Sequence, residues 1–443
     1  MTDAQHNPIQ SRQVALDLLL SVLDKKQPLD IMLDRNDAYR ALDQRDRAFT
    51  RMIVSTTLRK LGQIDDLIRR AATQSRPPSP PALYCLLRLS VCQICFMDVP
   101  DYAVVDSAVR LAERNNMVRQ KGFVNGLLRT IGREWKDWVK KQDAGKINIP
   151  EWLLKYWIAD YGLRCAAEIA LASQSEASTD ITLKQTHDPA APDMQHWADI
   201  LDATILPTGS LRLHQPRPIP DLHGFDDGDW WVQDASSALP ATLFPGDIRG
   251  STIVDLCAAP GGKTAQLAAQ GANVIAVDRS AQRLKRLHEN LERLKLGDHV
   301  HVETADGSVW KPQQKIDHIL VDAPCSATGT IRRHPDVMHL RDISDIERMQ
   351  KAQQKLLHNA WDILSTGGVM IYCTCSLQHA EGEHQIAAFL DANKNARRLP
   401  VQAAELGDLS EIITPDGDVR VLPQTLTTAG GMDGFYIARL QKS

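Results

Sequence analysis

The sequence predicts a multi-domain chain: an all-α bundle first, a small α+β connector next, and a doubly wound, Rossmann-like α/β domain last. Two patterns predict this. Apolar residues recur at helical spacing through the first third of the chain. After Ser251, β-branched runs alternate with helical segments, which is typical of a parallel sheet with helices on both faces. We expect the three domains to span residues 1–145, 146–235 and 236–443.

The bundle is predicted from amphipathic spacing. Val14, Leu18 and Val22 lie at positions i, i+4 and i+8 with charged residues between them. The same apolar spacing occurs at 103–114 and 121–133, and the first third shows almost no strand-like alternation. The first domain is therefore expected to be entirely helical.

The other two domains are predicted from a change in pattern. Residues 151–173 suggest a helix, 181–186 a short strand, and Pro-rich turns follow, which gives a small α+β connector. The parallel sheet is predicted from five runs: TIVDLCA, ANVIAVD, HVHVETAD, IDHILVDAP and GGVMIYCTCS. Each run is followed by a turn or a helical segment, so the strands should lie parallel.

Composition excludes several classes of protein. With 43% hydrophobic and 24% charged residues, the chain is typical of a globular protein and not of a disordered or fibrous one. No stretch approaches the ~20 apolar residues of a membrane span, and the first residues lack a signal peptide's basic start and apolar run. We expect no membrane partner and a cytoplasmic protein, in which the eight cysteines act as thiols and not as disulfides.

Charge is unevenly distributed along the chain. Residues 1–150 contain 24 lysines and arginines against 17 acidic residues, whereas residues 151–443 contain 27 against 38. A basic N-terminal third suits a polyanion such as RNA, although solvated charges on helix surfaces would give the same count.

The first strand of the α/β domain leads into a loop that resembles a cofactor site. The candidate residues of this loop are Cys257, Ala258, Ala259, Pro260, Gly261, Gly262 and Lys263. The two glycines let the backbone approach a ligand, and the helix that follows offers unpaired N–H groups. Lys263 is expected to steady the loop, and Cys257 to contribute its backbone.

Two acidic residues complete the candidate cofactor site. Asp278 ends the second strand, where a carboxylate can accept the hydroxyls of a ribose, and Asp306 follows the third strand, where it can accept from an adenine amino group. A dinucleotide is one possible ligand, but the loop reads A-A-P-G-G and not G-x-G-x-x-G. S-adenosylmethionine, which has no phosphates, fits this set better.

Two cysteines follow the fourth and fifth strands. Cys325 and Cys375 should face one crevice, because the carboxyl ends of neighbouring parallel strands meet at the same edge of a sheet. A thiolate that adds to carbon 6 of a pyrimidine makes carbon 5 nucleophilic enough to attack a methyl donor. Asp322 could hold N3 and N4 of a cytosine. By this chemistry alone, either thiol could attack.

Several motifs resemble those of the RNA (cytosine-5)-methyltransferase family: VQDASS, DLCAAPGGKT, DAPCSATGTIRRHPD, TCS and GGMDGFYIARL. YAVVDSAVRLAER and KGFVNGLLRTI in the first third are similar to the RNA-binding antitermination factor NusB. The resemblance implies that Cys375 attacks carbon 6 and that Cys325 assists release of the product. It also implies that Cys257 to Lys263, with Asp278, Asp306 and Asp322, bind S-adenosylmethionine.

The combination of the two resemblances implies a substrate in small-subunit (16S) rRNA, methylated before or early in subunit assembly by a monomer that needs no metal. Two alternatives stay open: a tRNA cytosine-5 methyltransferase, and a non-catalytic RNA-binding factor in ribosome assembly. The sequence departs from the family pattern at 379–382, where His-Ala-Glu-Gly replaces Pro-x-Glu-Asn, and at 183–186 in the connector. Cys373 also stands where the family often has alanine, so it is expected to be a small buried residue or a substitute thiol.

Other residues have two interpretations each. Cys92 and Cys95 form a lone CxxC pair that fits a helical core better than zinc. Trp230 and Trp231 are expected in the core and not as a base-stacking platform. The basic run at 332–334 could bind phosphates or form a solvated turn.

Overall fold

The computed structural model describes residues 8–72, 76–185 and 191–443. The chain divides into two compact units: residues 1–175 with 333–342, and residues 176–332 with 343–443. The division into three domains at 1–145, 146–235 and 236–443 stays a prediction. None of the helices in the described ranges is both long and apolar enough to span a bilayer.

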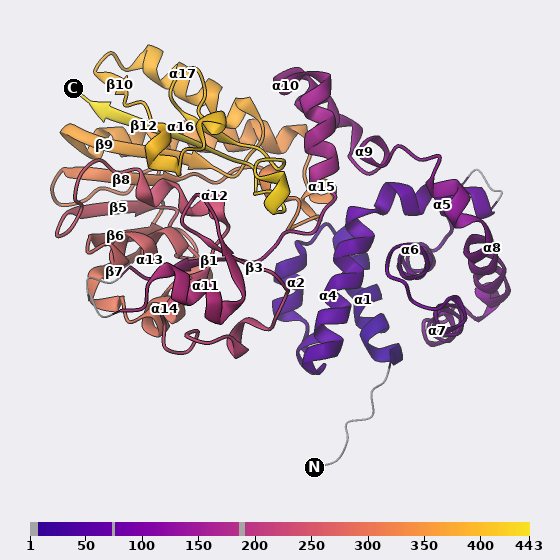
Figure 1. The fold of residues 1–443 in the computed structure, drawn as a ribbon. Helices are drawn as coiled ribbons and strands as arrows, with labels where there is room; N and C mark the ends of the chain where they lie inside the picture. The colour runs from indigo at the N-terminus through magenta and orange to yellow at the C-terminus, as the bar shows by residue number, and fades with distance from the viewer. Residues whose placement is uncertain (1–7, 73–75, 186–190) are drawn as a thin grey trace. The chain divides into compact units, whose positions relative to one another are not determined.

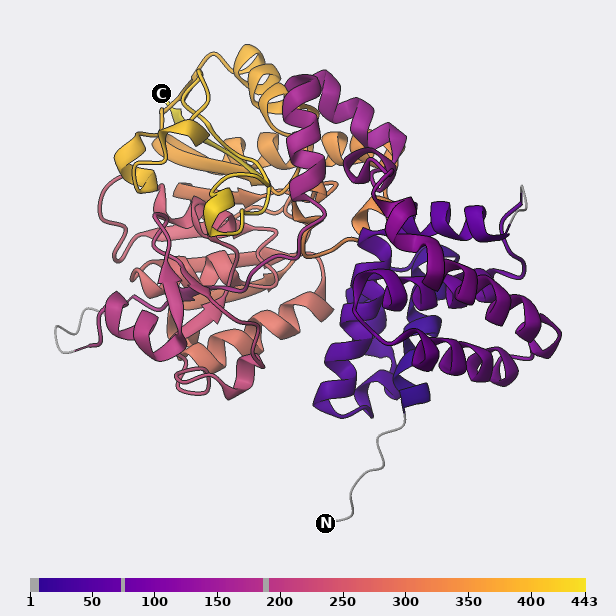
Figure 2. The ribbon, with the colours of Figure 1, turned by 45° about the vertical axis from the view of Figure 1, so that its right-hand side comes forward.

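The first unit is a helical bundle, as predicted (Figures 1 and 2). Its helices are α1 (Pro8–Leu23), α2 (Leu29–Arg35), α3 (Asp37–Arg40), α4 (Gln44–Arg59), α5 (Leu61–Ala72), α6 (Pro81–Phe96), α7 (Asp101–Arg114), α8 (Lys121–Val139), α9 (Ala144–Ile147), α10 (Glu151–Ala172) and α15 (Val337–Leu340). The residues whose spacing predicted α1 are buried: Val14 is 2% exposed, and Leu18 and Val22 are fully covered. Burial of this apolar face stabilises the bundle, because short helices are marginal alone.

The second unit begins with the small α+β connector. Its four-stranded antiparallel sheet has the order β2-β3-β1-β4. The strands are β1 (Asp180–Leu183), β2 (Ala203–Ile205), β3 (Leu211–Leu213) and β4 (Trp230–Val232), and α11 (Met194–Leu201) packs on them. Trp230 is fully buried and Trp231 is 5% exposed, so both belong to the core as predicted.

The main sheet of the second unit contains the five predicted parallel strands. These are β5 (Thr252–Leu256), β6 (Asn273–Asp278), β7 (Val300–Thr304), β8 (Ile316–Asp322) and β9 (Leu364–Thr374), in the order β9-β8-β5-β6-β7 (Figure 1). β5 pairs in parallel with both β6 and β8, so the strand order reverses beside β5. Ligands of such sheets bind outside the carboxyl ends of the strands at this reversal.

Helices cover both faces of the main sheet. One core contains α13 (Gly262–Ala269) and α14 (Ala281–Leu294), and the other contains α16 (Ile343–Ile363) and α17 (Glu383–Ala392). The four-residue α12 (Ala235–Ala238) precedes β5. Successive residues of β5 alternate between the two cores, as Ile253 and Val254 do. The predicted doubly wound α/β domain is therefore confirmed.

Three strands beyond the five predicted ones extend the sheet. They are β10 (Ala396–Arg398), β11 (Val419–Val421) and β12 (Phe435–Lys442). β12 pairs antiparallel with β9 over Tyr436–Gln441, which places the GGMDGF segment at the start of a strand next to the carboxyl end of β9.

Candidate active site

The loop between β5 and α13 is held close to β6. The backbone N–H groups of Cys257 and Ala258 donate to the Val277 carbonyl at 2.8 and 3.2 Å. Gly261 has φ 106°, which only glycine adopts easily, and a Cβ there would lie 2.9 Å from the Leu287 side chain. The loop therefore needs glycine at this position to pack against α14.

The two acidic residues beside this loop differ in exposure. Asp278 is 2% exposed, and its carboxylate accepts from the N–H groups of Ala259 at 3.2 Å and Ser280 at 2.9 Å. Asp306 is exposed, and hydrogen bonds from the Ser308 hydroxyl and N–H lower the pKa of its carboxyl. Asp278 thus anchors the loop between β5 and α13, which we call the candidate cofactor loop, while Asp306 presents a carboxylate at the end of β7.

The two cysteines expected to carry the chemistry lie side by side. β8 and β9 are parallel neighbours, and Cys325 and Cys375 follow their ends with the two Sγ atoms 3.4 Å apart. The hydrogen bond to Cys375 and burial raise the pKa of Cys325 well above its usual value, and the charges of Cys375 and Glu381 act in the same direction. Burial and the contact with Cys375 thus favour the protonated thiol form of Cys325.

Asp322 is fixed from two sides. Its Oδ2 accepts from Lys263 Nζ at 2.7 Å, and its Oδ1 accepts from Cys373 Sγ at 3.6 Å. Burial opposes the charge on Lys263, but the charges of Asp322, Cys373 and Asp255 and the hydrogen bond to Asp322 together outweigh it and raise the pKa of the ammonium group. Lys263 thus does more than steady the loop, because it joins the candidate cofactor loop to the end of β8. Cys373 is fully buried beside Asp322 and donates to it.

The segment after Cys375 contains a residue that the sequence reasoning did not select. Residues His379–Glu381 form a short 3₁₀ helix, and Glu381 is fully buried against the loops of both cysteines. Glu381 stands at the glutamate position of Pro-x-Glu-Asn, the one named residue of that motif that this segment keeps. The available signal was the serine that follows each cysteine, together with an acidic residue six positions after Cys375.

Other predicted candidates lie outside the reaction centre. Arg332 is buried and donates to the Gly430 carbonyl, so it is neither an exposed phosphate ligand nor part of a solvated turn. Cys92 and Cys95 are buried in the bundle core. In the connector motif at 183–186, Lys184 donates to the Leu294 carbonyl at 3.2 Å, and Thr186 lies outside the described residues.

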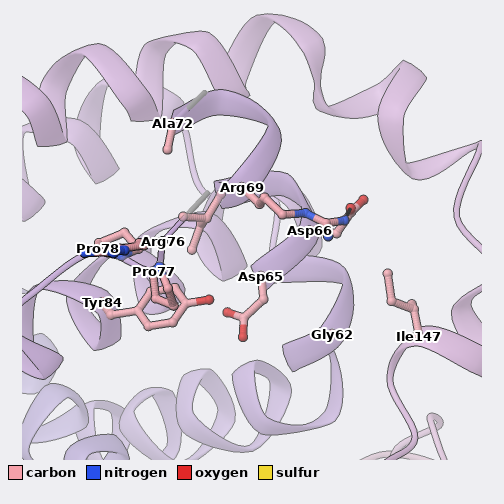
Figure 3. A pocket seen from close by; sticks show the side chains of 11 residues that line it. Gly62, Asp65, Asp66, Arg69, Ala72, Arg76, Pro77, Pro78, Tyr84 and Ile147 are labelled. Atoms are coloured by element: carbon pink, nitrogen blue, oxygen red, sulfur yellow. Dashed lines mark hydrogen bonds and ion pairs between the residues drawn. The ribbon is translucent and has the colours of Figure 1, made fainter. Parts of the chain in front are cut away.

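The bundle also contains a pocket that is separate from this chemistry (Figure 3). Its charged walls include Asp65, Asp66 and Arg69. Arg88 contacts Asp65 through two nitrogens at 2.7 Å, and Arg70 lies 2.8 Å from Asp66. The pocket's acidic groups are therefore already neutralised within the bundle.

No group of three or more histidine, cysteine or acidic side chains suited to a metal ion occurs in the part of the chain that the structure describes.

Comparisons with known proteins identify the family of the chain. Residues 243–441 match the family model described as 16S rRNA methyltransferase RsmB/F, and residues 9–133 match the NusB family. The chain is 34% identical to ribosomal RNA small subunit methyltransferase B of Serratia proteamaculans over 97% of this chain and 98% of the relative. It is 32% identical to the protein of the same name in Escherichia coli K12, again over 97% and 98%.

Solved structures share the fold. The protein titled PH0851 superposes with a TM-score of 0.76 at 21% identity and covers 98% of this chain and 99% of its own. A methyltransferase homologue from Pyrococcus horikoshii has a TM-score of 0.53 at 26% identity over 67% of this chain and 100% of its own. With full-length relatives above 30% identity and both family models matched, this chain belongs to the family of ribosomal RNA small subunit methyltransferase B, with a NusB-family domain at its N-terminus.

Proposed function

We propose that the chain transfers a methyl group from S-adenosylmethionine to carbon 5 of one cytosine in small-subunit (16S) rRNA, through a covalent bond between Cys375 and carbon 6. The observation that carries the proposal is the pair of thiols 3.4 Å apart at the ends of β8 and β9, beside the Asp322 carboxylate. Packing alone gives no reason for two thiols at adjacent strand ends.

The candidate cofactor loop supports S-adenosylmethionine as the methyl donor. Gly262 leaves the backbone open to a ligand, since a Cβ there would come no closer than 3.5 Å to Gln233. Asp278 keeps lone pairs for ribose hydroxyls beyond the two bonds that it accepts, since a carboxylate has about four acceptor sites. Asp306 is the acceptor for the adenine amino group. The bound donor would supply an electrophilic methyl group on a sulfonium.

Asp322, Cys375 and Cys325 each carry out a different step of the proposed reaction. Asp322, oriented by Lys263, accepts from the N4 amino group of the flipped-out cytosine, and it accepts from N3 as well once N3 has taken up a proton from solvent during addition at carbon 6. The Cys375 thiolate adds to carbon 6, and carbon 5 then attacks the methyl group. The carbon-5 proton leaves to a base, the bond from sulfur to carbon 6 breaks, and the Cys325 thiol protonates the departing sulfur. The raised pKa of Cys325 keeps that proton available.

The substrate and setting follow from the family and the charge distribution. The relatives are named for ribosomal RNA of the small subunit. The N-terminal 150 residues carry the chain's basic excess, which suits an RNA partner. We place the reaction in the cytoplasm, on rRNA before or early in subunit assembly, with the protein acting as a monomer that needs no metal.

The mechanism is tested with two cysteine variants. Cys375→Ser should abolish methylation and leave the affinity for S-adenosylmethionine nearly unchanged, as titration calorimetry would show. Cys325→Ala should accumulate an enzyme–RNA adduct that survives denaturation and appears as a shifted band on a gel. Turnover by Cys375→Ser would contradict the nucleophile assignment, and an unshifted Cys325→Ala band would contradict the release role.

The substrate is tested by bisulfite sequencing of total RNA from cells with and without the gene. The expected result is that one cytosine of small-subunit rRNA loses its protection. Loss at a tRNA position would keep the mechanism and overturn the substrate. If no cytosine changed, the reaction at carbon 5 would be rejected, and a binding role in ribosome assembly would replace it.

A further inference from the structure

A single buried carboxylate connects the loops that carry the two thiols. Glu381 has no exposed surface. Its Oε1 accepts from the Ser326 backbone N–H at 2.9 Å, and its Oε2 accepts from the Ser376 hydroxyl at 2.6 Å and from the Ser326 hydroxyl. Ser326 directly follows Cys325, and Ser376 directly follows Cys375. Both cysteines are therefore one residue away from a hydrogen bond to the same side chain.

We propose that Glu381 is a positioning residue, which holds the Cys325 and Cys375 loops against each other by accepting hydrogen bonds from the serine after each cysteine. The inference deepens the proposed function and rests on it, because the spacing of the two sulfurs matters only if both take part in the reaction. Among the described residues, Glu381 forms its hydrogen bonds to Ser326 and Ser376 and none to either sulfur, so it acts through these two serines.

The carboxylate is itself fixed by a second set of contacts. Gln353 of α16 donates to Glu381 Oε1 at 3.0 Å and to the Pro324 carbonyl at 3.0 Å. The Tyr372 hydroxyl of β9 donates to the Glu381 carbonyl at 2.8 Å. The Ser376 oxygen, whose proton is donated to Glu381, accepts from the Gln378 backbone N–H at 3.1 Å. Glu381 therefore has little freedom to move, and the loops that it holds share that restraint.

The chemistry of the contacts requires an acceptor-only group. Two hydroxyls, one backbone N–H and one amide N–H converge on the two oxygens of Glu381. A carboxylate can satisfy four donors, whereas a glutamine would turn an NH₂ group toward two of them. Four donors thus reach the two oxygens of this buried carboxyl group, as a buried polar group requires.

The charge of Glu381 also reaches Cys325. The hydrogen bond to Cys375 and burial contribute most to the raised pKa of Cys325, and the Glu381 charge adds to them. Replacing the carboxylate by a neutral amide should therefore lower the pKa of Cys325. A residue with only a structural role elsewhere in the fold would not change the pKa of Cys325. This pKa is therefore a second, independent readout of the role of Glu381.

The test uses Glu381→Gln in the full-length chain with RNA substrate. Because misplacing reacting groups by about 1 Å can cost about 100-fold in rate, we expect kcat to fall by roughly that factor. KM for RNA and Kd for S-adenosylmethionine should stay within about two-fold of wild type. The matched control is Glu405→Gln. The Glu405 carboxylate accepts from Arg439 at 2.6 Å and from the Gln402 N–H at 2.8 Å and has no hydrogen bond to either cysteine loop among the described residues. The kcat of the Glu405→Gln variant should therefore equal that of wild type.

Two further variants guard against misfolding. Ser326→Ala and Ser376→Ala each remove one hydroxyl contact and keep the carboxylate in place, so each should lower kcat less than Glu381→Gln does. Cys325 alkylation, followed against pH in a Cys375→Ser background, should shift to lower pH when Glu381→Gln is added. A raised KM at unchanged kcat, or an unshifted alkylation profile, would overturn the positioning role.

The adduct experiment separates this inference from the proposed function. If Cys325→Ala accumulates the RNA adduct, the covalent mechanism stands, and adding Glu381→Gln should slow adduct formation about ten-fold or more. Equal adduct rates with and without Glu381→Gln would overturn the inference alone. The absence of any adduct from Cys325→Ala would instead count against the proposed function.

Discussion

Asp255 is a buried carboxylic acid beneath the candidate cofactor loop. It is 1% exposed, its Oδ2 accepts from the Thr264 hydroxyl at 2.6 Å, and its Oδ1 has no hydrogen-bond partner among the described residues. Burial raises the pKa of Asp255 to about 7, and the nearby Asp322 and Asp278 act in the same direction. The folded protein therefore holds a neutral Asp255 at pH values where the unfolded chain has already ionised it.

The pH dependence of stability follows from this shift. Because the folded pKa lies above the unfolded value of ~3.9, the free energy of unfolding should fall as pH rises from about 4 to about 7 and change no further from this group above that range. Asp255→Asn should flatten this decline, since an amide does not titrate. Thermal unfolding midpoints of both proteins at several pH values between 5 and 8 measure the difference. Parallel curves would show that Asp255 is charged in the folded state.

The individual site residues were predictable from the sequence to different degrees. The placement of Cys325, Cys375, Asp278 and Asp306 follows from strand ends in a parallel sheet, which a hydrophobic pattern locates well. Glu381 was missed because its role depends on a side chain turning inward from a 3₁₀ helix, which has no periodic signal. The partner of Lys263 was missed for a related reason, since the pairing with Asp322 joins residues 59 positions apart.

At the scale of elements, the loop after β8, which contains Cys325, depends on a close approach to the segment before β12. The Gly434 N–H donates to the Gly329 carbonyl at 2.9 Å, and the Gly329 N–H donates to the Cys375 carbonyl at 2.9 Å. A Cβ at Gly329 would lie 2.0 Å from the Gly434 carbonyl oxygen. The GGMDGF segment therefore sets the position of the loop after β8 from outside the five parallel strands.

Gly329→Ala tests this contact. The added methyl group has no room, so we expect a loss of about 1–3 kcal/mol in the free energy of unfolding, together with reduced methylation. Gly297→Ala is the control, because a Cβ at Gly297 meets nothing within 4 Å, and its stability should stay within about 0.5 kcal/mol of wild type. Urea unfolding of both variants gives the comparison. Equal stability of the two would mean that the loop can move away without cost.

The elements that were predicted share a local signal. α1, α7 and α8 show apolar spacing at i and i+4, and β5, β6, β8 and β9 are short runs rich in buried apolar residues, as parallel strands usually are. β12 was not recognised as a strand, because its neighbour β9 lies far earlier in the chain and pairs antiparallel with it. Pairing of this kind comes from tertiary packing, which the spacing of one segment does not reveal.

At the scale of the whole molecule, the two units are not consecutive in the chain. After Arg332 the chain leaves the methyltransferase unit, contributes residues 333–342 to the helical bundle, and returns at Ile343. In the bundle, Asp336 accepts from the Leu29 N–H at 2.9 Å, and the His339 ring lies 2.9 Å from the Leu58 carbonyl. Burial lowers the pKa of His339, so its ring is neutral at physiological pH. The bundle therefore includes residues 333–342, which follow the loop after β8 in the chain.

This interleaving predicts how the bundle behaves alone. A fragment of residues 1–175 lacks residues 333–342 and leaves the Leu29 N–H and the Leu58 carbonyl without these partners, so it should unfold at a lower temperature than the bundle does in the full chain. A peptide of residues 333–342 added in trans should raise the unfolding temperature of the fragment in proportion to its binding, because a ligand of the folded state stabilises it by mass action. The same peptide with Asp336→Ala should have a weaker effect, since it cannot accept from Leu29. If neither peptide changed the melting temperature, the segment would be a passive connection, and the bundle would owe its stability to its own helices alone.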